Sequence, residues 1–134
     1  MRNRYLLGLL LALMLTSCGG GGGGQTANIA GTWVGSWSSL RYAGAGGQFI
    51  MNLSQSGNSF GGTAQLTNSC FGTLQVTGSL AGNNFIATLS DGGRQRVSVS
   101  GTVVGNATSG TYRTLDLTGT NCLEDQGTFS AGRS

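Results

Sequence analysis

Apolar residues recur at every second position through most of this chain, in short runs separated by turn sequences. In residues 48–55 (QFIMNLSQ), for example, Phe49, Met51 and Leu53 alternate with other side chains, and the turn sequence SGNS follows. Successive side chains of a strand point to opposite faces of the sheet, so a period of two predicts strands with one apolar face. After residue 28 there is no proline and no stretch with the spacing of an amphipathic helix. These features predict an all-β fold.

Eight such runs follow one another with short turns between most of them. They span residues 31–38, 48–55, 60–66, 72–80, 85–90, 94–103, 108–115 and 125–133. Antiparallel strands in hairpin order fit an up-and-down barrel, which removes exposed sheet edges by closing. The dipeptide Gly-Thr recurs on or near most of the runs, and glycine within a strand is favoured where a small barrel must bend sharply. A single barrel domain over residues 29–134 is therefore predicted, and a two-sheet β-sandwich is the alternative.

The N-terminus has the layout of a secretory signal. Arg2 and Arg4 precede an apolar run over residues 5–15, which is too short to span a bilayer as a permanent helix. The next residues, Leu15-Thr16-Ser17-Cys18, resemble the lipobox of bacterial lipoproteins. The resemblance implies a signal peptide over residues 1–17 and a mature protein that begins at Cys18, which carries lipid such as palmitate. An ordinary signal peptide followed by an incidental cysteine is the alternative.

Residues 18–28 are predicted to be a tether between the lipid and the barrel. They contain six consecutive glycines and no large apolar side chain that could offset the entropy of ordering. Ten such residues have a reach of roughly 17 Å as a flexible coil. In the lipoprotein family, glycine after the cysteine is compatible with the outer membrane. We therefore expect a lipid-anchored protein of the bacterial cell envelope, with the membrane face left open.

Charge and cysteine content narrow the expected partners. Without Arg2 and Arg4, five arginines face four carboxylates, a net charge of about +1, and no patch could neutralise a run of phosphates. Nucleic acid is therefore not an expected partner.

With Cys18 used for lipid, Cys70 and Cys122 remain, and in an oxidising compartment they are expected to form a disulfide. A metal site is the alternative, but the chain has no histidine and a closed zinc site needs four ligands.

Gly31-Thr32-Trp33 resembles the Gly-x-Trp start of the calycin barrels, the lipocalins and avidins. In lipocalins this tryptophan packs at the closed end of the barrel against an arginine from late in the chain. The resemblance implies that Trp33 plugs one end, with Arg113 and Arg133 as the candidate arginines. It covers only short motifs, and no ligand-binding residue of those families can be placed on this chain.

Proton chemistry has few candidate groups in this sequence. There is no histidine and no lysine, and no base is evident that could activate a serine nucleophile. Arg94 and Arg96 are two residues apart, so on a regular strand both would point to one face, which we interpret as solvated rather than as an anion site. We expect a non-catalytic protein without catalytic residues, cofactor or metal.

Two non-enzymatic functions fit this interpretation. In the first, which we favour, the barrel is an interaction module for an unknown protein, such as a protease, and acts through its loops. Arg41 and Tyr42 are the candidate binding residues, because Tyr and Arg are common binding anchors, and residues 115–124 form the other candidate surface. The alternative is a carrier of a small apolar ligand, with room next to small inward residues such as Gly78 and Ala87.

Overall fold

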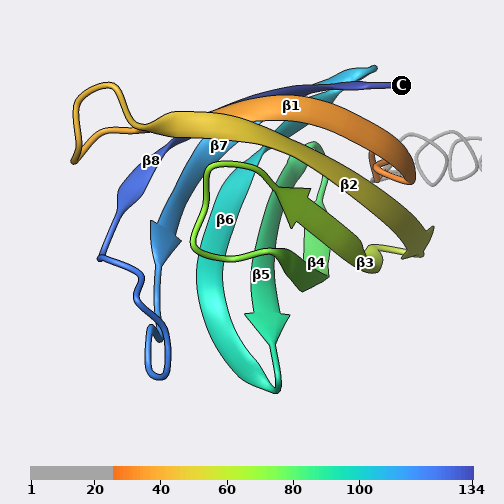
Figure 1. The fold of residues 1–134 in the computed structure, drawn as a ribbon. Coiled ribbons are helices and arrows are strands. Elements are labelled where there is room, and N and C mark those ends of the chain that lie inside the picture. The colour runs from red at the N-terminus through yellow and green to blue at the C-terminus, as the bar shows by residue number, and fades with distance from the viewer. Residues whose placement is uncertain (1–25) are drawn as a thin grey trace, which may run out of the picture.

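Eight antiparallel strands close into a barrel in a computed structural model that describes residues 26–134 (Figure 1). The strands are β1 (Gly31–Ser39), β2 (Gly46–Ser56), β3 (Ser59–Leu66), β4 (Thr73–Ala81), β5 (Asn84–Asp91), β6 (Arg94–Val104), β7 (Ala107–Thr114) and β8 (Gln126–Arg133). Each strand pairs with the next one, and β8 returns to pair with β1, with Val34 opposite Gly132. The predicted all-β up-and-down barrel is thus confirmed.

Several predicted features lie outside the described residues. These are the signal peptide over residues 1–17, the lipidated Cys18 and most of the tether. Within residues 26–134 no helix is long and apolar enough to cross a membrane. Ala27, which we assigned to the tether, donates its backbone N–H to the carbonyl oxygen of Gly82 at 3.1 Å. Contact with the barrel therefore begins two residues before Ile29.

The barrel interior is filled from the predicted apolar faces of the strands. The alternating residues that the sequence assigns to the core point inward, and most of them are buried, as Phe49, Leu74 and Val99 illustrate. Gly62 shows why glycine occurs within a strand: its φ is +157°, and an added Cβ would overlap the carbonyl oxygen of Asn52 on the neighbouring strand. Only glycine fits this close approach of two backbones.

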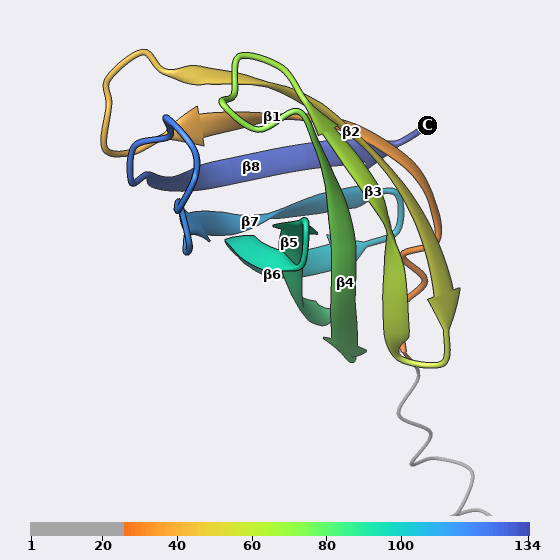
Figure 2. The same cartoon turned by 60° about the horizontal axis from the view of Figure 1, so that its bottom comes forward.

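The two ends of the barrel differ. At one end the turns at residues 57–58, 82–83 and 105–106 are short. At the other end the loops at residues 40–45, 67–72 and 115–125 are longer, and Figures 1 and 2 show these three loops gathered at the same end. We call the first the closed end and the second the open end.

Trp33 and Arg133 plug the closed end. Trp33 is 1% exposed and donates its Nε1–H to the carbonyl oxygen of Ile29 at 2.8 Å. The guanidinium carbon of Arg133 lies 4.4 Å from the centre of a Trp33 ring, and the same guanidinium donates to the carbonyl oxygens of Asn28 and Ala30. Its remaining acceptors are the Gly105 carbonyl and the Asn106 side chain. Arg113 instead lies exposed on the outer face of β7, opposite Gln126.

Candidate binding site at the open end

A cavity of about 250 Å³ lies at the open end of the barrel. Protein interiors have few voids larger than a water molecule, so a space of this size in a small domain needs an explanation. Its walls are mainly apolar and come from seven strands, all except β4, and from three loops. The larger lining side chains are Trp37, Tyr42, Phe49, Met51, Leu66, Phe71, Leu89, Val97, Val99, Tyr112, Leu123 and Phe129.

Aromatic side chains make up much of the cavity wall. The rings of Trp37 and Tyr112 meet edge to face, with centroids 6.0 Å apart. Deeper in the barrel, Phe49 and Phe129 make a similar contact at 6.2 Å. Such pairs hold each other in fixed orientations, so the cavity has rigid faces on which a flat or apolar molecule can pack.

The closed half of the barrel offers almost no space. Its void measures about 30 Å³, roughly the volume of one water molecule in the liquid. The Phe60 ring covers Gly78, where an added Cβ would lie 2.7 Å from Phe60 Cε2, and the Phe60 ring contacts that of Phe85. The expectation of room beside the small inward residues was therefore wrong at Gly78, because neighbouring aromatic rings occupy that space.

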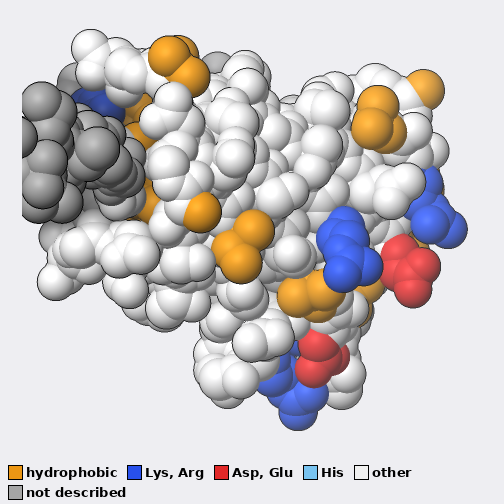
Figure 3. All heavy atoms as spheres, turned by 180° about the vertical axis from the view of Figure 1, so that it is seen from behind, with side chains coloured by type: hydrophobic (Ala, Val, Ile, Leu, Met, Phe, Trp, Pro, Cys, Tyr) orange, Lys and Arg blue, Asp and Glu red, His pale blue; other side chains and the backbone are white. Residues whose placement is uncertain are grey.

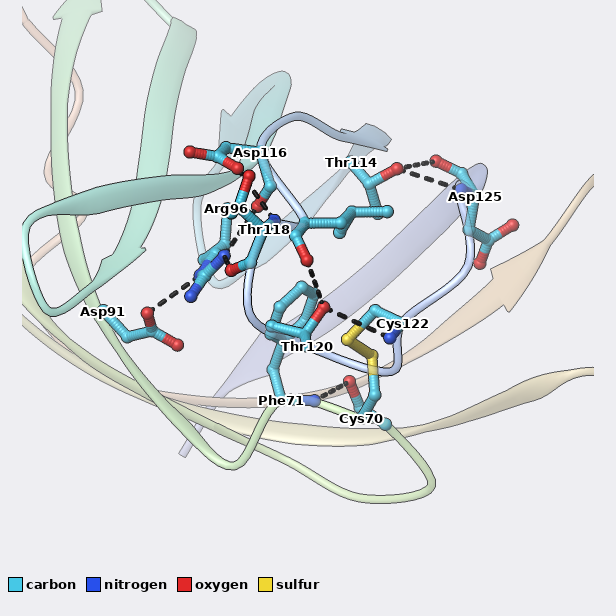
Figure 4. Close-up of a disulfide and its surroundings, with 12 residues drawn as sticks. Cys70, Phe71, Asp91, Arg96, Thr114, Asp116, Thr118, Thr120, Cys122 and Asp125 are labelled. Carbon is cyan, nitrogen blue, oxygen red and sulfur yellow. Dashed lines mark hydrogen bonds and ion pairs between the residues drawn. A yellow bond between two sulfur atoms is a disulfide. The ribbon is translucent and has the colours of Figure 1, made fainter.

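The disulfide between Cys70 and Cys122 joins two of the loops at the open end (Figure 4). This bond confirms the predicted pairing, with the two Cα atoms 5.5 Å apart. Both cysteines line the cavity, and Phe71, next to Cys70, is buried against it. The disulfide therefore fixes the β3–β4 loop and the β7–β8 loop relative to each other at the edge of the cavity.

Arg96 holds the β7–β8 loop through hydrogen bonds of its buried side chain. The prediction that this side chain is solvated was wrong. Leu89 pairs with Val97 and Ser90 with Gln95, so Arg96 is an extra residue in its strand, a β-bulge that turns its side chain inward. The side chain is buried and its Nε lies 2.8 Å from Asp91 Oδ1. Its Nη1 donates to the carbonyl oxygens of Asp116 and Thr118, as Figure 4 shows.

Asp125 is the acidic group of the cavity wall. Its Oδ1 accepts hydrogen bonds from the Ser39 hydroxyl at 2.5 Å and from the Gln126 backbone N–H at 2.8 Å. Its Oδ2 accepts one from the Tyr112 hydroxyl at 2.9 Å. Burial, together with this hydrogen bond and the Asp125 charge, raises the pKa of Tyr112 well above its usual range, so the phenol stays protonated as a donor.

Trp37 contributes a second polar atom to this region. Among residues 26–134, its Nε1 is a buried side-chain N–H without a hydrogen-bond partner. Buried donors are normally paired, because an unpaired one costs the full desolvation of the group. The indole also lines the cavity, so the region combines apolar faces with an unused donor and a carboxylate.

The candidate residues Arg41 and Tyr42 both lie at the mouth of the cavity. Tyr42 is 38% exposed and lines the cavity, and the Arg41 guanidinium lies 5.9 Å from the centre of its ring. Arg41 also pairs with Glu124 at 3.7 Å, between two largely exposed side chains. The structure thus brings the predicted Arg41–Tyr42 pair next to residues 115–124, the second predicted surface, at one rim.

Sequence reasoning missed three residues of this site. From the sequence, neither Trp37, Tyr112 nor Asp125 is assigned a role in binding. One signal was available: Trp37 lies four positions after Trp33 on the same strand, so the two face the same side. The hydrogen bonds of Asp125 depend on the closure of β8 against β1, which local patterns do not encode.

Comparisons with known proteins give no relative: no protein-family model and no curated protein sequence matches the chain. Within residues 26–134 no group of three or more His, Cys, Asp or Glu side chains is placed to hold a metal ion. The described site can therefore bind a ligand through its shape, its apolar surface, its hydrogen-bonding groups and one carboxylate.

Proposed function

We propose that this protein is a non-catalytic carrier that holds one small, largely apolar molecule in the open end of its barrel. The observation that carries the proposal is the cavity of about 250 Å³ with aromatic and aliphatic walls. Small-molecule sites are typically concave and mostly apolar, with a few polar groups that orient the ligand. Tyr112 and Asp125 are polar groups of this kind on the cavity wall.

The contrast between the two halves of the barrel supports this function. The closed half is packed to a residual void of about 30 Å³, so the chain is able to fill its interior. Unfilled space destabilises a fold in proportion to its volume. The open half keeps its space, although larger side chains at positions such as Val97 would reduce it. Binding of a ligand would explain why the protein tolerates the loss of stability that this space causes.

We also propose that the carrier is a lipoprotein of the bacterial cell envelope. The support is the Leu15-Thr16-Ser17-Cys18 sequence with its short apolar run, and the glycine-rich segment that follows. A disulfide-bonded domain is consistent with an oxidising compartment. Growth in the presence of labelled palmitate tests this part of the proposal, because a Cys18→Ala variant would then lose the label.

An interaction module is the second candidate, and the rim of the open end favours it. Leu40 and Leu123 are 71% and 69% exposed, and both lie in loops at this end. The wall of the barrel offers less: Figure 3 shows a mostly uncharged face with scattered hydrophobic side chains, and most of its charged side chains gather toward the open end. A partner protein would therefore bind at the rim, over the mouth of the cavity.

Native mass spectrometry of the gently purified protein tests the carrier function. A co-purified molecule that is lost from a Val97→Trp variant is the expected result, because Val97 is inward and lines the cavity. Ser100→Trp is the matched control, since Ser100 is exposed on the outer face of the same strand. A ligand that is still bound by Val97→Trp would contradict binding in the cavity. A pull-down partner lost only with Leu40→Ser and Leu123→Ser would favour the second candidate.

A further inference from the structure

We propose that the ligand is an organic cation, an apolar body of aromatic size bearing one ammonium group that binds at Asp125. This inference rests on the proposed carrier function and adds the chemical class of the ligand. It comes from two features of the cavity taken together: a carboxylate without a cationic partner among residues 26–134, and the aromatic faces around it.

Within the described part of the chain, the side-chain carboxylate of Asp125 receives hydrogen bonds only from neutral donors. These are the Ser39 hydroxyl, the Gln126 backbone and the Tyr112 hydroxyl. The ion pairs of residues 26–134 join other residues: Arg41 with Glu124, Arg94 with Asp116, and Arg96 with Asp91. The negative charge of Asp125 is therefore left without a balancing cation at the cavity wall.

The carboxylate also has an unused position for a donor. A carboxylate has about four acceptor positions, two on each oxygen. Ser39 and Gln126 use both positions of Oδ1, whereas within residues 26–134 Oδ2 accepts only from Tyr112. An ammonium group of the ligand can donate to the second position of Oδ2, and hydrogen bonds between charged groups are roughly twice as strong as neutral ones.

Aromatic faces are the natural surroundings for such a group. Trp37, Tyr42 and Tyr112 line the same cavity as Asp125, and the rings of Trp37 and Tyr112 are in contact. A cation near the face of an aromatic ring is attracted by the ring's quadrupole, and tryptophan and tyrosine are the strongest partners. Aromatic rings next to a carboxylate thus favour a protonated amine over a neutral molecule of the same shape.

The same charges disfavour organic acids. Arg133 is engaged at the closed end, and Arg96 is buried between Asp91 and the β7–β8 loop. Arg41, at the rim, already pairs with Glu124. A carboxylate ligand in the cavity would lie near Asp125, with no free cation among residues 26–134 beside it, so like-charge repulsion would weaken its binding.

Three probes with one indole body separate shape from charge: tryptamine (cationic), 3-ethylindole (neutral) and indole-3-propionate (anionic). Binding is measured by isothermal titration calorimetry at pH 7 to the full chain in phosphatidylcholine nanodiscs, with empty nanodiscs as the blank. We expect tryptamine to bind at least about 10-fold more tightly than 3-ethylindole, a difference of about 1.4 kcal/mol, and indole-3-propionate to bind most weakly.

Two isosteric variants assign the preference to one carboxylate. Asp125→Asn keeps the side-chain shape and should bring tryptamine down to the affinity of 3-ethylindole, whose own affinity stays unchanged. Glu124→Gln is the matched control, because Glu124 is the adjacent carboxylate but is largely exposed at the rim, and it should keep the preference. Loss of the preference in Glu124→Gln instead would overturn the role of Asp125.

The outcomes separate the two proposals. If none of the probes binds the wild type, the carrier function itself fails. If 3-ethylindole binds as tightly as tryptamine, the cavity is a binding site but the inference about charge is overturned. Should Asp125→Asn fail to fold, as judged by circular dichroism, the wild-type order across the three probes decides the inference about charge on its own.

Discussion

Replacement of Arg133 by methionine tests the plug at the closed end. Methionine keeps an unbranched apolar stem that can still cover Trp33, so the change removes mainly the guanidinium. That group donates to three backbone carbonyls and one side-chain oxygen, which belong to the N-terminal segment and the β6–β7 turn. The variant therefore removes the side-chain hydrogen bonds from β8 to these two segments.

The expected loss of stability follows from these contacts. The acceptors are partly exposed and regain water, so we take the lower end of the net range, about 0.5 kcal/mol for each of four hydrogen bonds. The contact with Trp33 at 4.4 Å contributes about 1 kcal/mol. The sum is about 3 kcal/mol in the free energy of unfolding, or about 12 °C in Tm for a domain of this size.

Urea unfolding of the oxidised protein, followed by tryptophan fluorescence, measures this loss. Arg133→Lys should fall between wild type and Arg133→Met, because lysine keeps the charge but not the planar fork of donors. Arg113→Met is the matched control and should change stability by less than about 0.5 kcal/mol, since Arg113 is exposed on the barrel wall. Equal effects of Arg133→Met and Arg113→Met would refute the reasoning.

Three further predictions concern the rest of the barrel. Replacing Cys70 and Cys122 together by serine should lower the free energy of unfolding by about 4 kcal/mol, because their bond closes a loop with a sequence separation of 52. Urea unfolding with and without reductant measures this loss, and an unchanged urea midpoint would contradict the prediction. Ala87→Leu should lower the free energy of unfolding by about 1–3 kcal/mol, because it overpacks the void of about 30 Å³. Binding of the indole probes at the open end should persist, and a stable variant that loses this binding would contradict the placement of the cavity. Because burial raises the pKa of Tyr112, the folded protein holds the phenol proton more tightly than the unfolded chain does, and this stabilisation is complete below about pH 10 and is lost as the pH rises further. Urea midpoints between pH 8 and 11 should therefore fall more steeply in the wild type than in Tyr112→Phe, and parallel curves would argue against a perturbed tyrosine.

The barrel could be predicted from the sequence because its strands follow a local rule. Residues such as Phe49, Met51 and Leu53 alternate with outward ones, and the short turns leave hairpin order as the simplest connection. The disulfide was predictable for a different reason, since Cys70 and Cys122 are the two cysteines that remain if Cys18 carries lipid. Both inferences need only the period of the strands or the composition of the chain.

The site depended on features without a local signal. Arg96 points inward because one extra residue in β6 shifts the register against β5, and nothing in Arg94-Gln95-Arg96 marks a bulge. The position of the cavity depends on which large rings fill the closed half, where Phe60 and Phe85 take the space left by Gly78. Such outcomes follow from side chains that meet across the barrel, far apart in the sequence.

The N-terminal segment and the mouth of the cavity lie at opposite ends of the barrel. The described chain enters at the closed end, where Ala27 bonds to the β4–β5 turn and the Ile29 backbone N–H donates to Gln55. The cavity opens at the other end, among the loops that the disulfide joins. If Cys18 carries lipid, the attachment reaches the barrel at the end remote from the mouth. The plug at Trp33 and Arg133 then serves two purposes, because it closes the interior and secures the segment through which the protein is attached. A ligand would then enter at the end of the barrel remote from this attachment.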